Sequence, residues 1–481
     1  MATSEGGVRV VTHGCRLNAA ESATMLEHAR AGGHNNLIIH NTCAVTAEAV
    51  RSARQAVRRS ARENPGARIV VTGCAAHTDG EGFAAMPEVD AVVGNGRKTA
   101  PGTWRSLPDF GVSASEKLRV DDHVFTREHA PHISSGPTPP SLTPPSLKPL
   151  PHVPLSDVPR ASEGRARAFL GVQNGCDHAC TFCIIPKGRG PSRSVPTGVV
   201  VEGARQLAGD GVAEIVLTGV DLTSWGGDLP GAPRLGDLVQ AILAHVPDLP
   251  RLRLSSIDSI EADPALMDAL GEARLMPHLH LSLQHGHDLI LKRMRRRHLR
   301  DDALAFCEDA RARRPGIALG ADLIAGFPTE TGEHHAANLS LIGECGLADA
   351  HIFPFSAREG TPAARMPPVP GPIIRERART LRDEASAAKT RWLDARIGTR
   401  DEVVVHHGQA SDGRRTGLTR DFCRALLPAG AGPGRRMAVR IVRREGNALA
   451  AMPDPSEGGS SGNDAGGDDT VRDHNLETDA G

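Results

Sequence analysis

Short apolar runs alternate with helical stretches six times between residues 167 and 356, and this alternation limits the fold more than any other feature of the sequence. The expected strands are Ala168–Gln173, Glu214–Val220, Arg251–Ser255, His278–Leu283, Ile317–Ile324 and Ala350–Phe355. Parallel strands need a crossover between them, which the intervening helices supply. The pattern predicts an α/β core, a partly closed (β/α)6 barrel whose reactive residues lie on loops after the carboxyl ends of the strands.

A second, shorter alternation occupies residues 1–110. The expected strands are Val8–Thr12, Leu37–His40, Ile69–Thr72 and Ala91–Val93, and the expected helices are Ala19–Ala31 and Thr46–Glu63. Thr46 is a residue type that caps a helix amino terminus. This region predicts an amino-terminal domain built on a parallel α/β sheet.

Composition changes mark three further boundaries. Residues 111–163 are rich in Pro and Ser, which predicts a linker between the amino-terminal domain and a core of residues 164–396. After a connecting helix at Ile374–Ala395, residues 397–452 hold short strands separated by Gly-containing turns, the pattern of a small β-barrel. Residues 453–481 carry eight acidic residues and one arginine, which predicts a disordered acidic tail.

The sequence contains no apolar run near the ~20 residues that a membrane span requires. We therefore expect a cytoplasmic protein with no membrane partner. In a reducing compartment its nine cysteines favour metal binding or catalysis over disulfides. Apart from the acidic tail the chain is mildly basic, which is compatible with an RNA partner.

Three cysteines follow the first expected barrel strand in the order Cys176, Cys180 and Cys183. Three thiolates can hold three irons of a 4Fe–4S cluster and leave the fourth iron open. An open iron can bind S-adenosylmethionine and pass an electron to its sulfonium, which releases a 5′-deoxyadenosyl radical. The alternative is a zinc site with His178 as a fourth ligand, although His178 stands between two of the cysteines and no second ligand pair follows.

The amino-terminal domain contains a second set of three cysteines. Cys15, Cys43 and Cys74 each follow one of its first three strands. Loops after parallel strands converge at one edge of a sheet, so these residues could share a cluster. The alternative is three unrelated buried cysteines. Cys307, Cys345 and Cys423 stand outside both sets and are interpreted as structural residues in helices or a strand.

The residues around both cysteine sets resemble the radical S-adenosylmethionine methylthiotransferases. The resemblance rests on Gln173-Asn-Gly-Cys-Asp, Cys180-Thr-Phe-Cys-Ile-Ile-Pro186, Arg189-Gly-Pro-Ser-Arg193, Leu281-Ser-Leu-Gln284, Ala325-Gly-Phe-Pro328 and His351-Ile-Phe-Pro-Phe-Ser356. It covers about residues 8–105 and 164–452. It implies two 4Fe–4S clusters, the second of which serves sulfur delivery, and S-adenosylmethionine as cofactor.

Three substrates are known in that family: threonylcarbamoyl-adenosine in tRNA, isopentenyl-adenosine in tRNA, and an aspartate of a ribosomal protein. Gly14-Cys-Arg-Leu-Asn18 and Asn41-Thr-Cys-Ala-Val-Thr46 look most like the threonylcarbamoyl-adenosine group. Lys187 departs from the Tyr that is common in that group. The implied partners are the anticodon loop of tRNA and an electron donor such as flavodoxin or ferredoxin. The sulfur donor stays open.

The resemblance also implies contacts to the cofactor and to RNA. Phe182 is expected near the adenine of S-adenosylmethionine, and Thr218, Gly219, Ser255 and Gln284 end strands where they could contact it, or could be turn and packing residues. The small carboxyl-terminal barrel resembles the RNA-binding TRAM domain.

Two basic clusters could meet RNA or could be solvated helix faces. They are Arg51, Arg54, Arg58, Arg59 and Arg62, and Lys292, Arg293, Arg295, Arg296, Arg297 and Arg300. A non-enzymatic alternative, an iron–sulfur redox sensor or RNA-binding regulator, leaves the six-unit barrel without a role.

Overall fold

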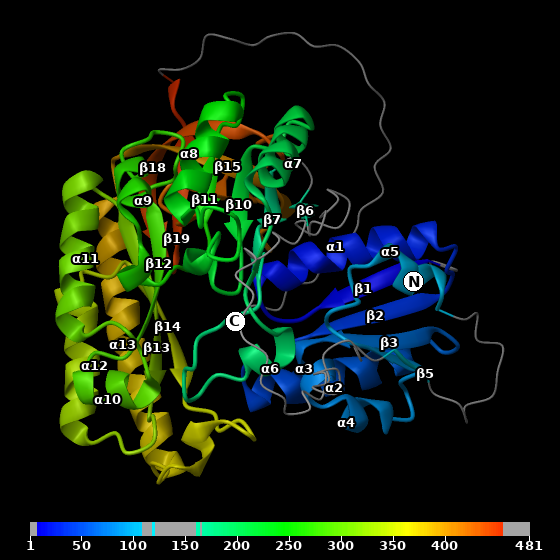
Figure 1. The fold of residues 1–481 in the computed structure, drawn as a ribbon. Helices are drawn as coiled ribbons and strands as arrows, with labels where there is room; N and C mark the ends of the chain where they lie inside the picture. The colour runs from blue at the N-terminus through cyan, green and yellow to red at the C-terminus, as the bar shows by residue number, and fades with distance from the viewer. Residues whose placement is uncertain (1–6, 108–117, 121–159, 164–165, 456–481) are drawn as a thin grey trace, which may run out of the picture.

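The computed structural model describes residues 7–107, 118–120, 160–163 and 166–455 of the 481-residue chain. Figure 1 shows an amino-terminal sheet beside a larger α/β region, with a small β-barrel packed behind the latter. This arrangement confirms the predicted fold class. No helix in the described ranges is both long and apolar enough to cross a membrane.

The amino-terminal domain is a parallel five-stranded sheet in the order β1-β2-β3-β4-β5. Its strands are β1 (Val8–Thr12), β2 (Leu37–Thr42), β3 (Arg68–Gly73), β4 (Ala91–Val93) and β5 (Leu118–Val120). Helices α1 (Arg16–Ala31) and α5 (Pro101–Arg105) pack on one face, and α2 (Ala47–Glu63), α3 (Cys74–Thr78) and α4 (Gly80–Ala84) on the other (Figure 1). The hydroxyl of Thr46 accepts a hydrogen bond from the Ala49 amide at 3.0 Å, which caps α2 as its sequence predicts.

The central region has six parallel strands in two sheets. They are β7 (Arg167–Gly171), β10 (Glu214–Thr218), β11 (Leu252–Leu254), β12 (His278–Gln284), β13 (Ala318–Ala325) and β14 (Asp349–Pro354). The sheets run β11-β10-β7-β6, where β6 is Arg160–Glu163, and β12-β13-β14. Single bridges at Leu252↔Leu275 and Ile257↔Leu281 connect them. The predicted six-unit barrel is therefore present as two joined arcs.

The outer face of this barrel is apolar and the inner face is largely polar. Leu279, Leu281 and Leu283 of β12 belong to the main core, whereas His278, His280 and Ser282 alternate with them and face inward.

The helices of the central region are α7 (Thr197–Gly209), α8 (Leu235–His245), α9 (Pro264–Ala269), α10 (Asp288–Met294), α11 (Arg300–Arg313), α12 (Gly332–Glu344) and the connecting α13 (Gly371–Ala395). Helix α1 contributes Ala20 to a small cluster with Phe169 and Val216, so it packs against the inner face of β7 and β10.

The segment predicted to be a linker, residues 111–163, contributes one short strand near each of its ends. Strand β5 pairs in parallel with β4, and strand β6 (Arg160–Glu163) pairs antiparallel with β7, so each neighbouring sheet gains an edge strand from this segment. Both strands are very short, and strands of that length leave little periodic signal in a sequence. The Pro-rich middle of the segment, residues 121–159, lies outside the described residues.

The carboxyl-terminal unit is a closed five-stranded barrel in the order β15-β16-β17-β19-β18, as predicted. Its strands are β15 (Arg400–Gln409), β16 (Arg415–Leu418), β17 (Arg424–Leu427), β18 (Arg436–Glu445) and β19 (Ala448–Pro453). The last strand extends one residue into the expected tail, and buried Asp454 forms an ion pair with Arg400 at 2.8 Å. Residues 456–481 lie outside the described part of the chain.

Candidate functional site

The loop that carries Cys176, Cys180 and Cys183 is closed at its base by a two-stranded antiparallel pair, β8 (Gln173–Asn174) and β9 (Arg193–Ser194). The Gln173 amide donates to the Gly175 carbonyl at 2.8 Å, and its oxygen accepts from the Asp221 amide at 2.8 Å. Gly175 has a φ of 78°, and a Cβ there would lie 1.9 Å from the Pro191 carbonyl oxygen. The loop therefore requires glycine at this position.

The other three predicted cysteines occupy equivalent places in the amino-terminal sheet. Cys15 is the N-cap of α1 after β1, Cys43 follows β2, and Cys74 opens α3 after β3. At Gly14 a Cβ would lie 2.7 Å from the Cβ of Cys43, so this glycine lets the Cys15 loop approach the Cys43 loop closely. The parallel sheet brings all three loops to one edge.

The two cysteine sets are neighbours. Helix α3 packs against α6 (Ile185–Arg189), and a Cβ on Gly188 would lie 3.4 Å from the Cβ of Cys74. Burial raises the pKa of Cys183 to about 11, and the negative charges of Cys180 and Cys74 contribute to that shift. Burial likewise raises the pKa of Cys43 to about 12, with contributions from Cys15 and Cys74. Cys74 thus lies within electrostatic range of both sets.

Neither set of three cysteine sulfurs is gathered at the spacing of a single zinc ion. Zinc–sulfur bonds of about 2.3 Å in a tetrahedron place sulfur atoms roughly 3.8 Å apart. In the described ranges, no three cysteine sulfurs all lie within 4.8 Å of one another. A cubane, which has its irons at separate corners, holds its cysteine sulfurs farther apart than a zinc ion does.

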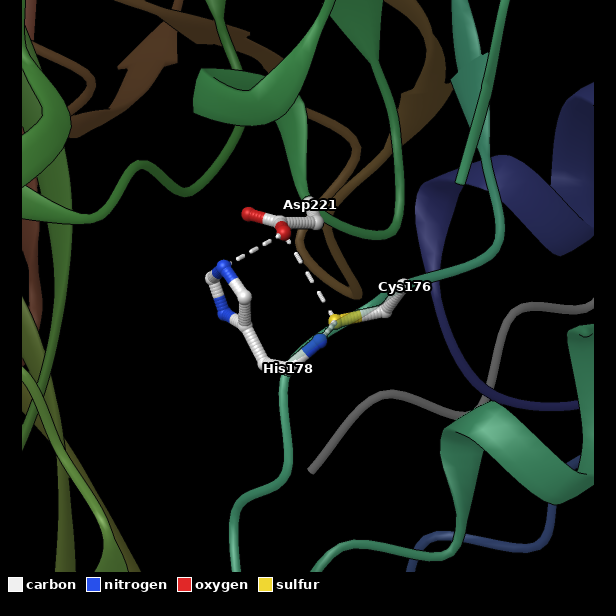
Figure 2. A group of neighbouring side chains, drawn as sticks. All are labelled: Cys176, His178 and Asp221. Carbon is white, nitrogen blue, oxygen red and sulfur yellow. Dashed lines mark hydrogen bonds and ion pairs between the residues drawn. The ribbon is translucent and has the colours of Figure 1, made fainter. Parts of the chain in front are cut away.

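The zinc alternative that uses His178 is also disfavoured by its surroundings. Figure 2 shows Cys176, His178 and Asp221 grouped together. Among the described residues, Cys180 and Cys183 belong to no such group of three possible ligands. The Nε2 atom of His178 lies 3.2 Å from Asp221 Oδ2 and 3.5 Å from Glu261 Oε1. Hydrogen bonds to Cys176 and Glu261 raise the pKa of His178 to about 10.

The residues expected near the cofactor separate into two kinds. Thr218 donates its hydroxyl to the Leu170 carbonyl at 3.2 Å, and Gly219 packs against Gln173, so both have packing roles in the described structure. The buried Ser255 hydroxyl has no hydrogen-bond partner among the described residues. Gln284 ends β12 with a φ of 66°, a conformation that non-glycine residues rarely adopt.

Phe182 packs beside Phe327, with ring centroids 6.4 Å apart and an interplanar angle of 85°. This apolar cluster also contains Ile290, Met294 and Ala363. On the other side of the loop, Arg296 contacts the Sγ of Cys180 at 3.6 Å and forms an ion pair with Asp258 at 2.6 Å. The cysteine loop is therefore held between an apolar cluster and a buried ion pair.

A buried polar network joins the two cysteine regions, and the sequence analysis assigned it no role. Arg189 donates to both carboxylate oxygens of Glu21, at 2.8 and 3.0 Å, and Lys98 lies 2.5 Å from the same carboxylate. The Asn95 amide donates to the Gly188 carbonyl at 2.7 Å. Arg189 opens the motif Arg189-Gly-Pro-Ser-Arg193, but nothing in the sequence marks Glu21 or Lys98 as its partners.

The second basic cluster is largely engaged within the protein. Arg293 donates to Thr329, Arg296 and Arg297 pair with acidic residues, and Arg300 lies 2.6 Å from Glu344. In the first cluster, Arg51 pairs with Glu48 and Arg54 with Asp79. Arg58, Arg59 and Arg62 on α2 are exposed and form no ion pair among the described residues.

The remaining cysteines lie apart from both sets. Cys307 is buried in α11, and Cys345 is the buried C-cap residue of α12. Cys423 lies in the turn before β17 rather than in a strand or helix.

Comparisons with known proteins agree with this geometry. The Radical SAM superfamily model matches residues 170–342, and the model of Uncharacterized protein family UPF0004 matches residues 7–94. The threonylcarbamoyladenosine tRNA methylthiotransferase MtaB of Rickettsia prowazekii is 42% identical over 83% of this chain and 87% of its own length. The chain belongs to the radical SAM methylthiotransferase family. As a radical SAM enzyme, this methylthiotransferase uses a 4Fe–4S cluster and S-adenosylmethionine.

Two further similarities extend over most of the methylthiotransferase. The tRNA-2-methylthio-N(6)-dimethylallyladenosine synthase of Cereibacter sphaeroides is 33% identical over 92% of this chain and 97% of its own length. The solved structure of the radical S-adenosylmethionine methyltransferase TsrM from Kitasatospora setae has a TM-score of 0.48 and 16% identity. It covers 74% of this chain and 73% of that one.

Proposed function

We propose that this methylthiotransferase converts threonylcarbamoyl-adenosine next to the anticodon of tRNA into its 2-methylthio derivative. The observation that carries the proposal is the difference in similarity between two relatives. Identity is 42% to a threonylcarbamoyladenosine tRNA methylthiotransferase and 33% to a dimethylallyladenosine synthase. The Gly14-Cys-Arg-Leu-Asn18 motif agrees with this choice.

Two 4Fe–4S clusters are assigned to the two cysteine sets. Cys176, Cys180 and Cys183 would hold the cluster that binds S-adenosylmethionine, because they stand on the loop after the first barrel strand. Cys15, Cys43 and Cys74 would hold the second cluster. Together with the cofactor these groups supply radical chemistry, which suits the C–H bond at carbon 2 because no side chain can deprotonate it near neutral pH.

The chain's own residues serve to position and shield the reactants. The unpaired hydroxyl of Ser255 and the amide of Gln284 are suited to bind the polar groups of S-adenosylmethionine. Phe182 offers an apolar face for its adenine ring. The contact between α3 and α6 keeps the two cysteine sets adjacent, and this arrangement suits a reaction that needs both.

The RNA partner would be bound outside the barrel. The carboxyl-terminal barrel and the exposed arginines of α2 are the candidate contacts for the phosphates of the anticodon arm. The cluster reactions require an electron donor, for which flavodoxin or ferredoxin has suitable chemistry. The sulfur donor is unassigned, and the proposed site of action is the cytoplasm.

The test incubates the anaerobically reconstituted, reduced enzyme with two tRNA preparations, one bearing threonylcarbamoyl-adenosine and the other isopentenyl-adenosine. Mass spectrometry of the nucleosides then detects methylthio products. We expect product from the threonylcarbamoyl substrate. Product from the isopentenyl substrate alone would overturn the substrate assignment. Modification of a ribosomal-protein aspartate with no RNA product would overturn the RNA assignment as well.

A further inference from the structure

Four arginines gather at the end of the barrel opposite the cysteine loop, around one aromatic ring. Phe422, from the carboxyl-terminal barrel, has the guanidinium carbons of Arg16, Arg253 and Arg167 at 5.0, 4.9 and 5.4 Å from its ring centroid. Arg251 lies beside them, 3.8 Å from Glu214. Phe422 and these four arginines, which come from the amino-terminal domain and the central barrel, are called the floor of the barrel below.

The arginines of this floor are not fully neutralised. Glu214 pairs with Arg253 at 2.8 Å and with Arg167 at 3.1 Å, and Glu402 pairs with Arg251 at 2.9 Å. Arg16 has no carboxylate within ion-pair distance among the described residues and donates no hydrogen bond there. One buried nitrogen each of Arg167 and Arg253 also has no acceptor. Four cations thus share two anions.

The electrostatics agree with an unmet positive charge. The charges of Arg167 and Arg253 repel that of Arg16, and Glu214 offsets this repulsion only in part. The His278 ring, 4.7 Å from the Phe422 ring, has a pKa well below its usual value because of burial and the neighbouring Arg253. A partly buried cation without a partner is costly, and an anionic ligand would remove that cost.

The barrel interior beside this floor is accessible on the side of β13 and β14, whereas Ala20 of α1 covers Phe169 and Val216 of β7 and β10. His351 and Asp322 face inward from adjacent strands with a ring nitrogen and a carboxylate oxygen 3.3 Å apart, yet their side chains are 59% and 23% exposed. Strand β10 runs from Glu214 at the floor to Thr218 at the cofactor end, which is about 13 Å for four residues. On the side of β13 and β14, where the charge of Arg16 reaches His351, a nucleoside near the cofactor could extend a side group toward Arg16.

We propose that Arg16 is a specificity residue that binds the carboxylate of the threonylcarbamoyl group of the substrate. This inference rests on the proposed function, since that group is the part of the modified adenosine that carries a negative charge. Arg16 directly follows Cys15, so one residue belongs to the second cluster site and the next reaches into the barrel. An isopentenyl group offers no anion for this cation.

The test uses reconstituted full-length enzyme and two anticodon stem-loops that differ in one group. One carries threonylcarbamoyl-adenosine with its free carboxylate, and the other carries the neutral methyl ester. The wild-type enzyme should prefer the acid by about 10- to 100-fold in kcat/KM, the range for a charge-assisted hydrogen bond. Arg16→Gln should lose that preference, Arg16→Lys should keep part of it, and Arg30→Gln, exposed on the same helix, should match the wild type.

Cluster content and reductive cleavage of S-adenosylmethionine are measured on each variant. Both should be unchanged in Arg16→Gln, which separates substrate binding from a role toward the cluster or the cofactor. Equal loss with acid and ester, or a shift in the reduction potential of the second cluster, would overturn the inference. Wild-type turnover of the acid and ester at equal rates would also overturn it while leaving the proposed function intact. Failure of the wild type on the acid stem-loop and on full-length tRNA with that modification would instead contradict the proposed function.

Discussion

Arg189 and Glu21 form a bidentate ion pair between helix α6, which follows the barrel cysteines, and the first helix of the amino-terminal domain. Both donor–acceptor distances are short, 2.8 and 3.0 Å, and both side chains are almost fully buried. Planar pairing of this kind fixes orientation as well as distance. The pair therefore sets how the two cysteine sets face each other.

We first predict that Glu21→Gln destabilises the protein by about 3–5 kcal/mol, because Arg189 and Lys98 would remain buried without an anion. Denaturant unfolding measures the change. Glu48→Gln is the matched control, since its ion pair with Arg51 is exposed and should contribute under about 1 kcal/mol. A change in Glu21→Gln no larger than in the control would show that the pair is dispensable.

The second prediction concerns acid stability. Burial alone would raise the pKa of Glu21, but the charges of Arg189 and Lys98 outweigh it and lower the pKa to about 2 from 4.5. A carboxylate whose pKa is lower in the folded protein stabilises it above the unfolded pKa, and loses this contribution as pH falls. Stability should decline by up to about 3 kcal/mol between pH 4.5 and 2. Glu21→Gln should remove this part of the pH dependence of unfolding.

The third prediction separates the two cysteine sets. The reconstituted wild type should bind about eight irons per chain, and either triple Ala variant about four. Loss of Cys176, Cys180 and Cys183 should abolish cleavage of S-adenosylmethionine. Loss of Cys15, Cys43 and Cys74 should spare cleavage and abolish methylthio product. Iron analysis and 5′-deoxyadenosine assays decide this, and a zinc-bound, iron-free protein would contradict both cluster assignments.

The fourth prediction uses the difference between two strand-end hydroxyls. Ser255→Ala should weaken S-adenosylmethionine binding several-fold with little loss of stability, because its buried hydroxyl has no partner to lose. Thr218→Val removes a hydrogen bond to Leu170 and should cost about 1 kcal/mol of stability without weakening cofactor binding. Equilibrium binding and denaturant unfolding of the same preparations test the pair. Weaker cofactor binding in Thr218→Val, together with lower stability in Ser255→Ala, would instead assign cofactor binding to Thr218 and packing to Ser255.

The fifth prediction concerns RNA. Changing Arg58, Arg59 and Arg62 to Gln should weaken tRNA binding. In a plot of the logarithm of the binding constant against the logarithm of the salt concentration, the slope should become less steep by about 0.7–0.9 for each lost phosphate contact. The control changes Arg375, Arg379 and Arg382, three exposed arginines of α13, and removes the same charge elsewhere. Equal weakening in both triple variants would show that net charge, rather than the α2 face, determines affinity.

Strand and helix positions follow from local pattern, which is why the sequence predicts most of them. Val8–Thr12 and Ala91–Val93 match the observed strands end to end, since apolar runs bounded by polar loops define them. The six cysteines were identifiable because each set follows strand ends. Glu21, Lys98 and Arg189 were not, because their pairing joins residues far apart in sequence and depends on how two domains dock.

Tertiary packing also decided what the basic clusters do. The sequence shows six basic residues between Lys292 and Arg300, a run that resembles an RNA-binding face. In the structure Arg296 and Arg297 point toward Asp258 and Glu261, acidic residues that follow β11. Charge runs in a sequence carry no information about such distant counter-charges.

The position of Phe422 affects how deletion experiments are interpreted. Because this ring of the carboxyl-terminal barrel lies among Arg16, Arg167 and Arg253, that small barrel covers the end of the central barrel where these arginines gather. Removing it would admit water to the barrel interior and release the arginines that it holds together. A truncated enzyme without activity would therefore say nothing by itself about RNA binding. Single substitutions on the outer surface of the carboxyl-terminal barrel are needed to separate recognition from chemistry.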